Sequence, residues 1–530
     1  MESRSRLGVE LKNQDGKHAQ RFAEYSAIVN SSMSRRLRDK QMWDSFFMFA
    51  MQKSGNFSVP GSGKTSSVLG MYAYLKAKGA VRRIVVISPK NAFGSWIDEF
   101  SVCFDGMEEL RLFNIHSPEY NTKVAKQRGI RLESGNCNLF LFNFESLGTY
   151  AEDIISLIDD QTMLVFDEVH KVKRVDGKHA TGAVNVAKAA IYVTAMTGTP
   201  IPNSYLDIYN FLHILFPTEY DDFFNFSPAF LRDTSAEDRE VINNKLQPFF
   251  CRTTKKQLDV PDANASEIIS VDGEDKENRV LKILKMKYRK NQLALVIRIM
   301  QLESEPKMLL RSLDLNDFRY LLDDSVDEKE IDYADYSDEI KTLIESFGET
   351  TKMQKCIWLA TKLAREGKPT VIWCVFIASI DYLASELRKL GISVKVIYGE
   401  VSLKDRLQII SDFKAGKFQI LITNPHTLAE SISLHSVCHD AIYFEYSYNL
   451  VHLLQSKDRI HRLGLPQGQY TQYYFLQTNY KTDEGEWSMG GAIYDRLLEK
   501  EKIMLDAIDN NVLEAMPTSK EDIAKIFANF

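Results

Sequence analysis

Short, uninterrupted apolar runs recur along both halves of this sequence, each bounded by loop residues and followed by a helix-like segment. Continuous rather than alternating apolarity indicates strands buried on both faces, as in parallel sheets covered by helices. Their shortness and their β-branched and aromatic content argue against buried helix segments. The two clusters of runs therefore predict an α/β fold with two lobes. The runs cover residues 82–88, 138–144, 162–168 and 189–198 in the first half, and 369–375, 394–399, 418–424, 440–446 and 471–477 in the second.

The segment between the two clusters, residues 217–345, has a different character. Residues 280–303 have helical spacing, with Lys282, Lys285 and Arg289 on one face. Residues 317–339 are rich in Asp and Glu, which indicates either a solvated connector or an acidic flap that competes with nucleic acid for a basic groove. The predicted parts are an N-terminal extension (1–34), lobe 1 (35–216), a mostly helical insertion with an acidic linker (217–345), lobe 2 (346–480) and C-terminal bracing helices (481–530).

Composition limits the class of protein. The chain has 530 residues, 44% hydrophobic and 26% charged, which is typical of a globular protein. Its net charge of −6 means that nucleic acid would have to be bound by local basic patches. Six cysteines without a C-x-x-C pair argue against a zinc site or a disulfide framework and favour a reducing compartment. Without a signal peptide or a long apolar run, we expect a soluble protein with no membrane partner, cytoplasmic in a microbial or virus-infected cell and nuclear in a eukaryote.

Residues 58–65, SVPGSGKT, match the phosphate-binding pattern G-x-x-x-x-G-K-[ST] except at Ser58, which takes the place of the first glycine. In such a loop, backbone N–H groups at the start of a helix cradle phosphates, Lys64 reaches the β- and γ-phosphate oxygens, and Thr65 ligates Mg²⁺. The pattern therefore predicts that the chain binds ATP with Mg²⁺. The ATP-binding residues of the loop are Gly61, Ser62, Gly63, Lys64 and Thr65.

A second motif, MLVFDEVH at 163–170, is an apolar run that ends in two carboxylates. Asp167 at a strand end can hold Mg²⁺ through water, and Glu168 can polarise the attacking water. In isolation this pair would be two surface acids that close a strand. Downstream of a phosphate loop, it favours ATP hydrolysis.

A third motif, LLQSKDRIHRLG at 453–464, distinguishes between classes of ATP-binding protein. Its spacing places Gln455, Arg459 and Arg462 on one face of a helix. Arginines supplied by a second lobe to a nucleotide held by the first act as arginine fingers, which a kinase or a simple switch does not need from such a lobe. The motif favours a motor whose lobes close on ATP, although a solvated basic helix face would produce the same spacing.

Taken in order, these motifs resemble the superfamily 2 helicases, and within them the Swi/Snf-like double-stranded DNA translocases. RLRDKQ (36–41) resembles the family's L-R-x-x-Q, and residues 85–100 resemble its P-K-x-x-x-x-x-W-x-x-E-F stretch. DEVHKVKR resembles D-E-x-H-x-x-K-N, MTGTPIPN (196–203) resembles T-G-T-P-x-x-N, and NFESL (143–147) stands where the family has T-Y-E. The resemblance implies two RecA-like lobes. It also implies an adenine contact at Gln41, DNA contacts at Lys90, Trp96 and Asn143, and residues that couple hydrolysis to DNA at His170, Thr197, Thr199 and Gln455.

The second half also follows the family. Residues 398–416 resemble the segment that implies Gly399 and a DNA contact at Arg406, and residues 494–508 resemble the bracing helix. Two departures are visible: Thr253 replaces the second arginine of the family's R-R-x-K segment, and Ser431 replaces a glycine in the loop that relays nucleotide state to DNA. The second departure leaves the efficiency of that coupling open.

The function implied is an ATP-dependent double-stranded DNA translocase, an ATP hydrolase that DNA stimulates. Its expected partners are duplex DNA and a protein that supplies targeting or nuclease function, because no reader or nuclease motif is visible in the sequence. Two alternatives stay open. One is a strand-separating or RNA helicase of superfamily 2, and the other is a nucleotide-gated scaffold subunit in which turnover is incidental.

Overall fold

A computed structural model describes residues 1–14, 16–172, 177–198, 200, 205–232, 234–314, 331–332, 335–425, 433–509, 519–528 and 530. The chain divides into two compact units. Unit 1 comprises Met1–Val260 and Ile503–Met516, and unit 2 comprises Pro261–Lys502 and Pro517–Phe530. The predicted insertion, 217–345, does not form a unit of its own, because its residues are divided between the two units after Val260.

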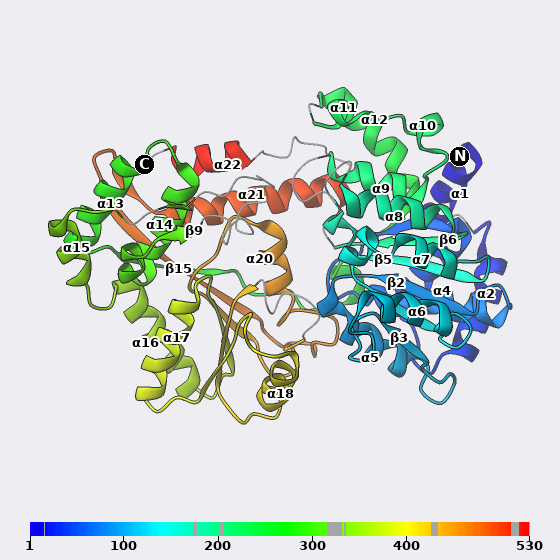
Figure 1. The fold of residues 1–530 in the computed structure, drawn as a ribbon, viewed down its shortest axis with the longest axis horizontal. Coiled ribbons are helices and arrows are strands. Elements are labelled where there is room, and N and C mark those ends of the chain that lie inside the picture. Colours follow the sequence, from blue (N-terminus) through cyan, green and yellow to red (C-terminus); the bar gives the residue numbers. More distant parts are fainter. Residues whose placement is uncertain are drawn as a thin grey trace. The chain divides into compact units, whose positions relative to one another are not determined.

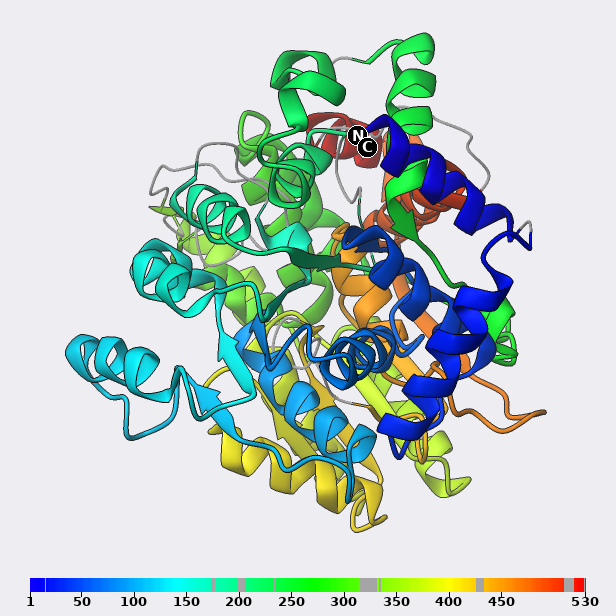
Figure 2. The ribbon, with the colours of Figure 1, turned by 90° about the vertical axis from the view of Figure 1, so that its right-hand side faces the viewer.

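Unit 1 is built on a parallel sheet of seven strands, in the order β3-β4-β2-β5-β6-β1-β7. Its four central runs predicted from sequence are confirmed as β2, β4, β5 and β6, and β2 and β4 are buried along their whole length. Figure 2 shows dark-blue and cyan helices on opposite sides of these strands, which explains the continuous apolarity. The strands are β1 (Lys53–Asn56), β2 (Arg83–Ile87), β3 (Leu112–Asn114), β4 (Leu139–Phe142), β5 (Thr162–Asp167), β6 (Tyr192–Met196) and β7 (Phe250–Cys251).

The N-terminal helices are an integral part of unit 1. Tyr25 is fully buried, and its hydroxyl lies 2.6 Å from Ser45 Oγ on α3. The indole of Trp43 donates to the carbonyl of Leu11 over 3.1 Å. The helices are α1 (Glu2–Asn13), α2 (Ala19–Ser32), α3 (Asp39–Met51), α4 (Lys64–Ala77), α5 (Phe93–Cys103), α6 (Lys123–Glu133), α7 (Ala151–Leu157), α8 (Lys178–Lys188), α9 (Asp207–Leu215), α10 (Tyr220–Phe223), α11 (Pro228–Arg232) and α12 (Ala236–Leu246).

Unit 2 contains a second sheet of seven strands, in the order β12-β13-β11-β14-β15-β16, with β8 also paired to β15. All its pairs are parallel except β15 with β16. The five runs predicted in the second half are confirmed as β11 to β15, and β15 is longer than its run. The strands are β8 (Glu267–Asp272), β11 (Thr370–Trp373), β12 (Val394–Ile397), β13 (Ile420–Thr423), β14 (Asp440–Tyr443), β15 (Gln472–Thr482) and β16 (Gly485–Trp487), with a separate short pair, β9 (Leu313–Asp314) and β10 (Ile331–Asp332).

The helices of unit 2 include two that sequence spacing predicted as one. The predicted helix at 280–303 is wrong in its continuity, because α13 ends at Lys287 and α14 begins at Gln292. The side chain of Asn291 accepts a hydrogen bond from Ala294 N, so it caps a new helix and ends the old register. Arg289 therefore lies outside α13. Figure 1 shows the helices α13 (Asp275–Lys287), α14 (Gln292–Ser304), α15 (Asp338–Glu345), α16 (Thr351–Arg365), α17 (Ile377–Lys389), α18 (Leu403–Lys414), α20 (Leu450–Lys457), α21 (Met489–Asp509) and α22 (Ser519–Ile526).

Hydropathy along the helices bears on membrane association. Within the residues that the structure describes, none of the helices is long and apolar enough to cross a bilayer.

Candidate functional site

The phosphate loop lies where a parallel sheet presents its ligand sites, after strand β1 and before helix α4. Gly61 and Gly63 have φ angles of 75° and 82°, in the left-handed region that favours glycine. A Cβ at Gly63 would lie 2.3 Å from Gln41 Nε2, so a larger residue cannot stand there. Gln41 Nε2 donates to the carbonyl of Ser62 over 2.8 Å. The structure thus brings Gln41 onto the loop, and its expected contact with adenine stays a prediction.

Ser58, the departure from the loop pattern, is buried in a hydrogen-bond network that sequence reasoning missed. Its hydroxyl accepts from the backbone N of Thr253 over 2.9 Å and lies 3.4 Å from Asp44 Oδ2. The Thr253 hydroxyl donates to the same carboxylate oxygen, and Lys40 Nζ lies 2.5 Å from the other one. Asp44 is one turn beyond Gln41 on α3, so the network joins that helix, the start of the loop and Thr253, the second residue after β7.

Lys64 is the first residue of α4, and Thr65 follows in the first turn. Lys64 Nζ donates to the carbonyl of Ser58 over 3.0 Å, so the side chain folds back over the loop. Its charge helps to lower the pKa of Glu168 and opposes the rise in the pKa of Asp167. The ammonium, the loop and the two carboxylates therefore belong to one site.

Strand β5 ends at Asp167, and the next residue turns sharply. Glu168 has a φ of 55°, an uncommon value for a residue other than glycine, and it begins a short turn at Val169–Lys171. Asp167 Oδ2 accepts from the indole of Trp96 over 2.9 Å. Glu168 Oε2 lies 3.2 Å from His170 Nδ1, which in turn lies 2.9 Å from Thr197 Oγ1. The structure places Glu168, His170 and Thr197 in one chain of contacts that ends at the segment after β6.

The pKa values of the two carboxylates shift in opposite directions. Burial, with the charge of Glu168, raises the pKa of Asp167 above its ordinary value. Burial also opposes ionisation of Glu168, but the hydrogen bond and charge of His170, together with Lys64, lower its pKa well below the ordinary value. Glu168 is therefore the more readily ionised member of the pair.

The residues expected to contact DNA are not all at the surface. Lys90 is exposed at the start of a turn (Lys90–Ala92), and Asn143 is partly buried after β4. Trp96 differs from the expectation, because its side chain is fully buried in α5 and its indole is engaged by Asp167. Its large apolar ring is stabilised by burial, and its one N–H donor finds a buried carboxylate. Thr199, expected to take part in coupling, lies outside the described residues.

The arginine motif of unit 2 is only partly helical, which corrects the expectation of one helix face. Helix α20 ends at Lys457, and the backbone N of Arg459 bonds to Ser456 O in a tighter turn. In a continuing helix the backbone N of Arg459 would bond to the carbonyl of Gln455. That carbonyl instead accepts a hydrogen bond from the guanidinium of Arg459 over 2.9 Å. Gln455 and Arg459 are buried, whereas Arg462 is partly exposed in the turn that follows. The helix ends because a side chain satisfies the carbonyl that the next turn would have used.

Arg406 on α18 is engaged by the loop before its own helix. Its guanidinium donates to the carbonyl of Gly399 over 2.7 Å and to that of Val401 over 2.8 Å. It holds the shape of a loop at the carboxyl end of β12, and its expected DNA contact stays a prediction. Ser431 and the acidic segment at 317–330 lie outside the described residues.

A magnesium ion carried by a nucleotide fits the donors that are present. Among the residues described, no three or more His, Cys, Asp and Glu side chains gather to hold a metal ion by themselves. Mg²⁺ usually keeps several waters and binds through one or two carboxylates together with substrate phosphates. The hydroxyl of Thr65 and the carboxylate of Asp167 are oxygen donors of this kind.

Comparison with known protein families covers both units. Residues 58–314 match the SNF2-related domain, and residues 351–464 match the helicase conserved C-terminal domain. The first match includes the phosphate loop and the Asp167–Glu168 pair, and the second includes the arginine motif. The chain belongs to the SNF2-related, Swi/Snf-like helicases. The family expected from the sequence motifs is confirmed.

Curated relatives of this SNF2-related chain are named as ATP-dependent helicases. It is 21% identical over 456 residues to the ATP-dependent helicase fft1 of Schizosaccharomyces pombe, covering 76% of this chain and 46% of that protein. It is 22% identical over 429 residues to an uncharacterized ATP-dependent helicase, YqhH, of Bacillus subtilis, covering 80% of this chain and 72% of that protein. The chain thus spans less than half of the yeast relative and about three-quarters of the bacterial one.

A solved structure of the same family also matches the SNF2-related chain. It is the Sulfolobus solfataricus SWI2/SNF2 ATPase core in complex with dsDNA, 17% identical, with 93% of this chain and 97% of that chain covered and a TM-score of 0.39. The two α/β lobes expected from the sequence are present as the sheets of units 1 and 2.

Proposed function

We propose that this chain is an ATP-driven motor that moves along double-stranded DNA. The observation that carries the proposal is the chain of contacts in unit 1 from Glu168 through His170 to Thr197, at a carboxylate whose pKa the charge of Lys64 in the phosphate loop helps to lower. A nucleotide site connected to this chain of residues is suited to transmit to the rest of the unit whether ATP is bound or hydrolysed. Family membership and the names of the relatives support the same activity.

The residues of unit 1 have distinct roles in ATP hydrolysis. Gly61 and Gly63 let backbone N–H groups face the phosphates, and Lys64 leaves the Ser58 carbonyl to pair with them. Thr65 and Asp167 would hold Mg²⁺, which supplies charge neutralisation on the phosphates when it is bound. Glu168, whose pKa is low, is ionised and can orient and accept a proton from the attacking water. Trp96 fixes the carboxylate of Asp167 by its hydrogen bond.

The arginines of unit 2 would couple ATP binding and hydrolysis to movement of the two units. We assign Arg459 and Arg462 to the nucleotide as arginine fingers, so that closure of the two units depends on ATP and reopening follows hydrolysis. Gln41 is assigned to the adenine ring, on the strength of its place beside Ser62.

Duplex DNA is the substrate along which the motor would move. Lys90, Asn143 and Arg406 are assigned to DNA, and contacts to phosphates predict binding that depends little on sequence and weakens with salt. Because the chain has a net charge of −6, its DNA contacts must be concentrated in a groove. A protein partner would supply targeting, in the cytoplasm of a microbe or the nucleus of a eukaryote.

Hydrolysis of ATP by the purified chain tests the proposal. The rate is measured alone and with duplex DNA, single-stranded DNA or RNA, for the wild type, Lys64→Ala and Glu168→Gln. We expect strong stimulation by duplex DNA that both variants lose, while Glu168→Gln still binds ATP. Greater stimulation by RNA would point to an RNA helicase. A partner-binding activity that survives Glu168→Gln, with hydrolysis indifferent to nucleic acid, would point to a scaffold.

A further inference from the structure

An exposed tryptophan lies on helix α16 of unit 2, a helix that carries none of the residues assigned to ATP or DNA. The side chain of Trp358 is 53% exposed. Lys355 Nζ lies 4.1 Å from the centroid of its ring and Lys362 Nζ lies 5.6 Å from it. Tryptophan is large and apolar, so an exposed one flanked by cations is a frequent mark of a binding surface.

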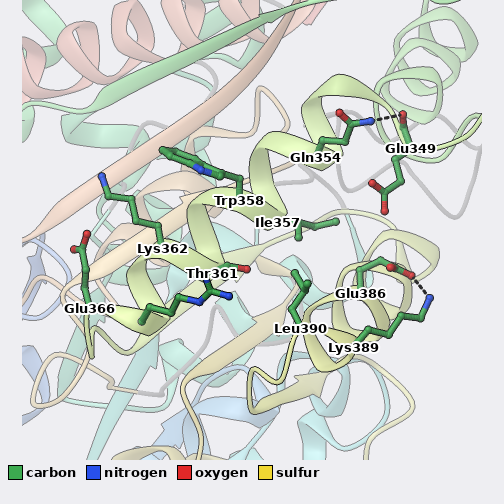
Figure 3. Close-up of a pocket in the computed structure, with 11 residues that line it drawn as sticks. Glu349, Gln354, Ile357, Trp358, Thr361, Lys362, Glu366, Glu386, Lys389 and Leu390 are labelled. Atoms are coloured by element: carbon green, nitrogen blue, oxygen red, sulfur yellow. Dashed lines mark hydrogen bonds and ion pairs between the residues drawn. The ribbon is translucent and has the colours of Figure 1, made fainter.

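A hollow of about 720 Å³ adjoins this tryptophan, with walls formed by α16 and α17. Figure 3 shows Ile357 from α16 and Leu390 from the end of α17 pointing into the space between the two helices. The hydroxyl of Thr361, in the same wall, is buried and has no hydrogen-bond partner among the described residues. The hollow therefore has an apolar floor and an unused polar group, and its volume suits one or two bulky side chains.

The carboxylates and the cations around the hollow differ in whether they have a bonding partner. Each carboxylate on its rim already has a partner: Glu349 accepts from Tyr382 over 3.0 Å, Glu366 pairs with Lys368 at 2.8 Å, and Glu386 pairs with Lys389 at 2.6 Å. By contrast, no ion pair joins Lys355, Lys362 or Arg365 to any carboxylate in the part of the chain that is described. The surface consequently presents three cations beside Trp358 that form no ion pair among the described residues, and one of them, Lys362, helps to lower the pKa of nearby Glu366.

We propose that this face of α16, comprising Lys355, Trp358, Lys362 and Arg365, docks an acidic segment of a partner protein. The segment places carboxylates on the three cations and inserts a bulky apolar side chain between α16 and α17. From Lys355 to Arg365 the helix rises about 15 Å, the length of roughly three helical turns of a partner. Nucleic acid would pair with the cations, but a phosphate backbone carries no apolar side chain to fill the hollow. A protein segment satisfies both features.

The proposal goes beyond ATP hydrolysis and DNA movement, and it stands or falls separately from them. The lining of the hollow includes none of the residues assigned to the nucleotide or to DNA. We therefore expect Trp358→Ala to leave the basal rate of ATP hydrolysis unchanged. If the motor activity is absent but docking is present, only the proposed function fails.

Fluorescence anisotropy of a labelled peptide on the full chain tests the docking surface. The probe is three repeats of Glu-Glu-Leu-Phe, and its controls are repeats of Glu-Glu-Ala-Ala and of Lys-Lys-Leu-Phe. We expect saturable binding of the first peptide only, weakened at least about tenfold by Trp358→Ala and by the double variant Lys355→Glu/Lys362→Glu. Leu407→Ala is the matched control, because Leu407 is 59% exposed on α18, outside the hollow.

Several outcomes would overturn the proposal. Equal binding of the alanine peptide would show that charge alone acts, and binding that Trp358→Ala does not weaken would place the site elsewhere. Displacement of the probe by a short duplex DNA, with equal loss of duplex affinity in Trp358→Ala, would assign the surface to nucleic acid. Dimerisation that Trp358→Ala abolishes would assign it to a second copy of the chain. Trp358→Phe, which keeps an aromatic ring, should retain most of the binding and so separates a docking defect from misfolding.

Discussion

The carboxylate of Asp44 connects three segments on which the nucleotide loop depends. It is 1% exposed, and hydroxyl donors from Ser58 and Thr253 meet it from two different segments. A buried carboxylate without such donors would be costly, because burial penalises an unpaired charge. Ser58 and Thr253, two of the departures from the family pattern, therefore stabilise each other across 195 residues of sequence.

Removal of the Thr253 hydroxyl should reveal this link. Thr253→Val keeps the shape of the side chain but leaves Asp44 without one donor, which should lower the free energy of unfolding by about 1–3 kcal/mol. Because the start of the phosphate loop is then less fixed, the KM for ATP should rise more than kcat falls. Thr253→Ser, which keeps a hydroxyl, is the control in urea unfolding and in steady-state kinetics. Equal behaviour of the two variants would contradict the role of the hydroxyl.

Lys12 on α1 gives the stability of the chain a dependence on pH. Burial lowers its pKa from 10.5 to about 7, and Cys251, Lys40 and Asp44 are the titratable groups near it. The unfolded chain thus holds this proton more tightly than the folded chain. The destabilisation caused by burying Lys12 is complete below about pH 7, where the lysine is protonated in both the folded and the unfolded chain. It decreases as the pH rises toward 10.5.

Lys12→Met should therefore raise Tm by a few degrees at pH 6 to 7, although it also removes the contact of Lys12 with Phe250. The gain over the wild type should shrink at pH 9, where the lysine of the folded wild type is already neutral. Thermal unfolding of the wild type and of Lys12→Met between pH 6 and pH 9 measures this difference in Tm. A difference that does not change with pH would mean that the lowered pKa contributes nothing to stability.

At the residue scale, motif spacing predicted which residues form the nucleotide site better than it predicted the burial and the contacts of those residues. The spacing of GSGKT and DEVH sufficed to place Lys64, Asp167 and Glu168 in one site. It did not predict Asp44, because no local pattern marks a helix residue whose donors come from distant segments. Trp96 was expected at the surface since its motif lies beside DNA contacts in the family, whereas its burial depends on the packing of α5 against α4 and on the hydrogen bond from its indole to Asp167.

At the scale of elements, helix α17 begins on a buried carboxylate. Glu445, just after β14, accepts from the backbone N atoms of Val375 and Phe376 over 2.6 and 2.9 Å and from Ser379 Oγ over 2.6 Å. These N–H groups lie at the start of the helix, where no intrahelical acceptor exists for them. A single side chain therefore links strand β14 to the helix that forms one wall of the hollow.

Glu445→Ala should lower the free energy of unfolding by about 2–5 kcal/mol, because it leaves buried donors without an acceptor. Glu445→Gln keeps one acceptor oxygen and should cost less. Urea unfolding gives both values, and Glu486→Ala, at an exposed position on β16, is the matched control. A loss no larger in Glu445→Ala than in the control would show that water satisfies these donors.

Strands were more predictable than helix ends. Burial on both faces leaves a continuous apolar run, so all nine runs predicted from sequence are strands. Helix ends depend on side-chain hydrogen bonds, which periodicity does not report. Asn291 divides one predicted helix into α13 and α14, and α20 ends at Lys457, before both arginines of its motif, with the Arg459 guanidinium on the carbonyl of Gln455.

At the scale of the whole molecule, the cooperation of its two units can be tested with one arginine. If Arg459 acts on a nucleotide held by unit 1, Arg459→Ala should lower the duplex-stimulated kcat by about 10³-fold or more. ATP binding, measured by equilibrium titration, should change little. Arg365→Ala, an arginine of the same unit on the face of α16, is the control. Loss of activity that is equal in both variants would mean that Arg459 has no special role in hydrolysis.

The division of the chain was only partly predictable. The two lobes follow from the two clusters of apolar runs, but the predicted insertion crosses the boundary at Val260. Strand β8 explains why. It belongs to the sequence of the connector but pairs with β15 in the sheet of unit 2, and no local signal reports which distant strand will accept a neighbour.

This pairing also has a consequence for how the chain is made. All the described strands of unit 1's sheet have been synthesised once translation has passed Cys251, so that sheet can assemble early in synthesis. Strand β8 must then wait for β15, roughly 200 residues and on the order of 10–40 seconds of translation later. During this interval its N–H and C=O groups are unpaired and are a template for non-native pairing. A chain truncated before β15 lacks the Ile503–Met516 segment of unit 1, but it should carry the folded sheet of that unit and a tail that chaperones bind.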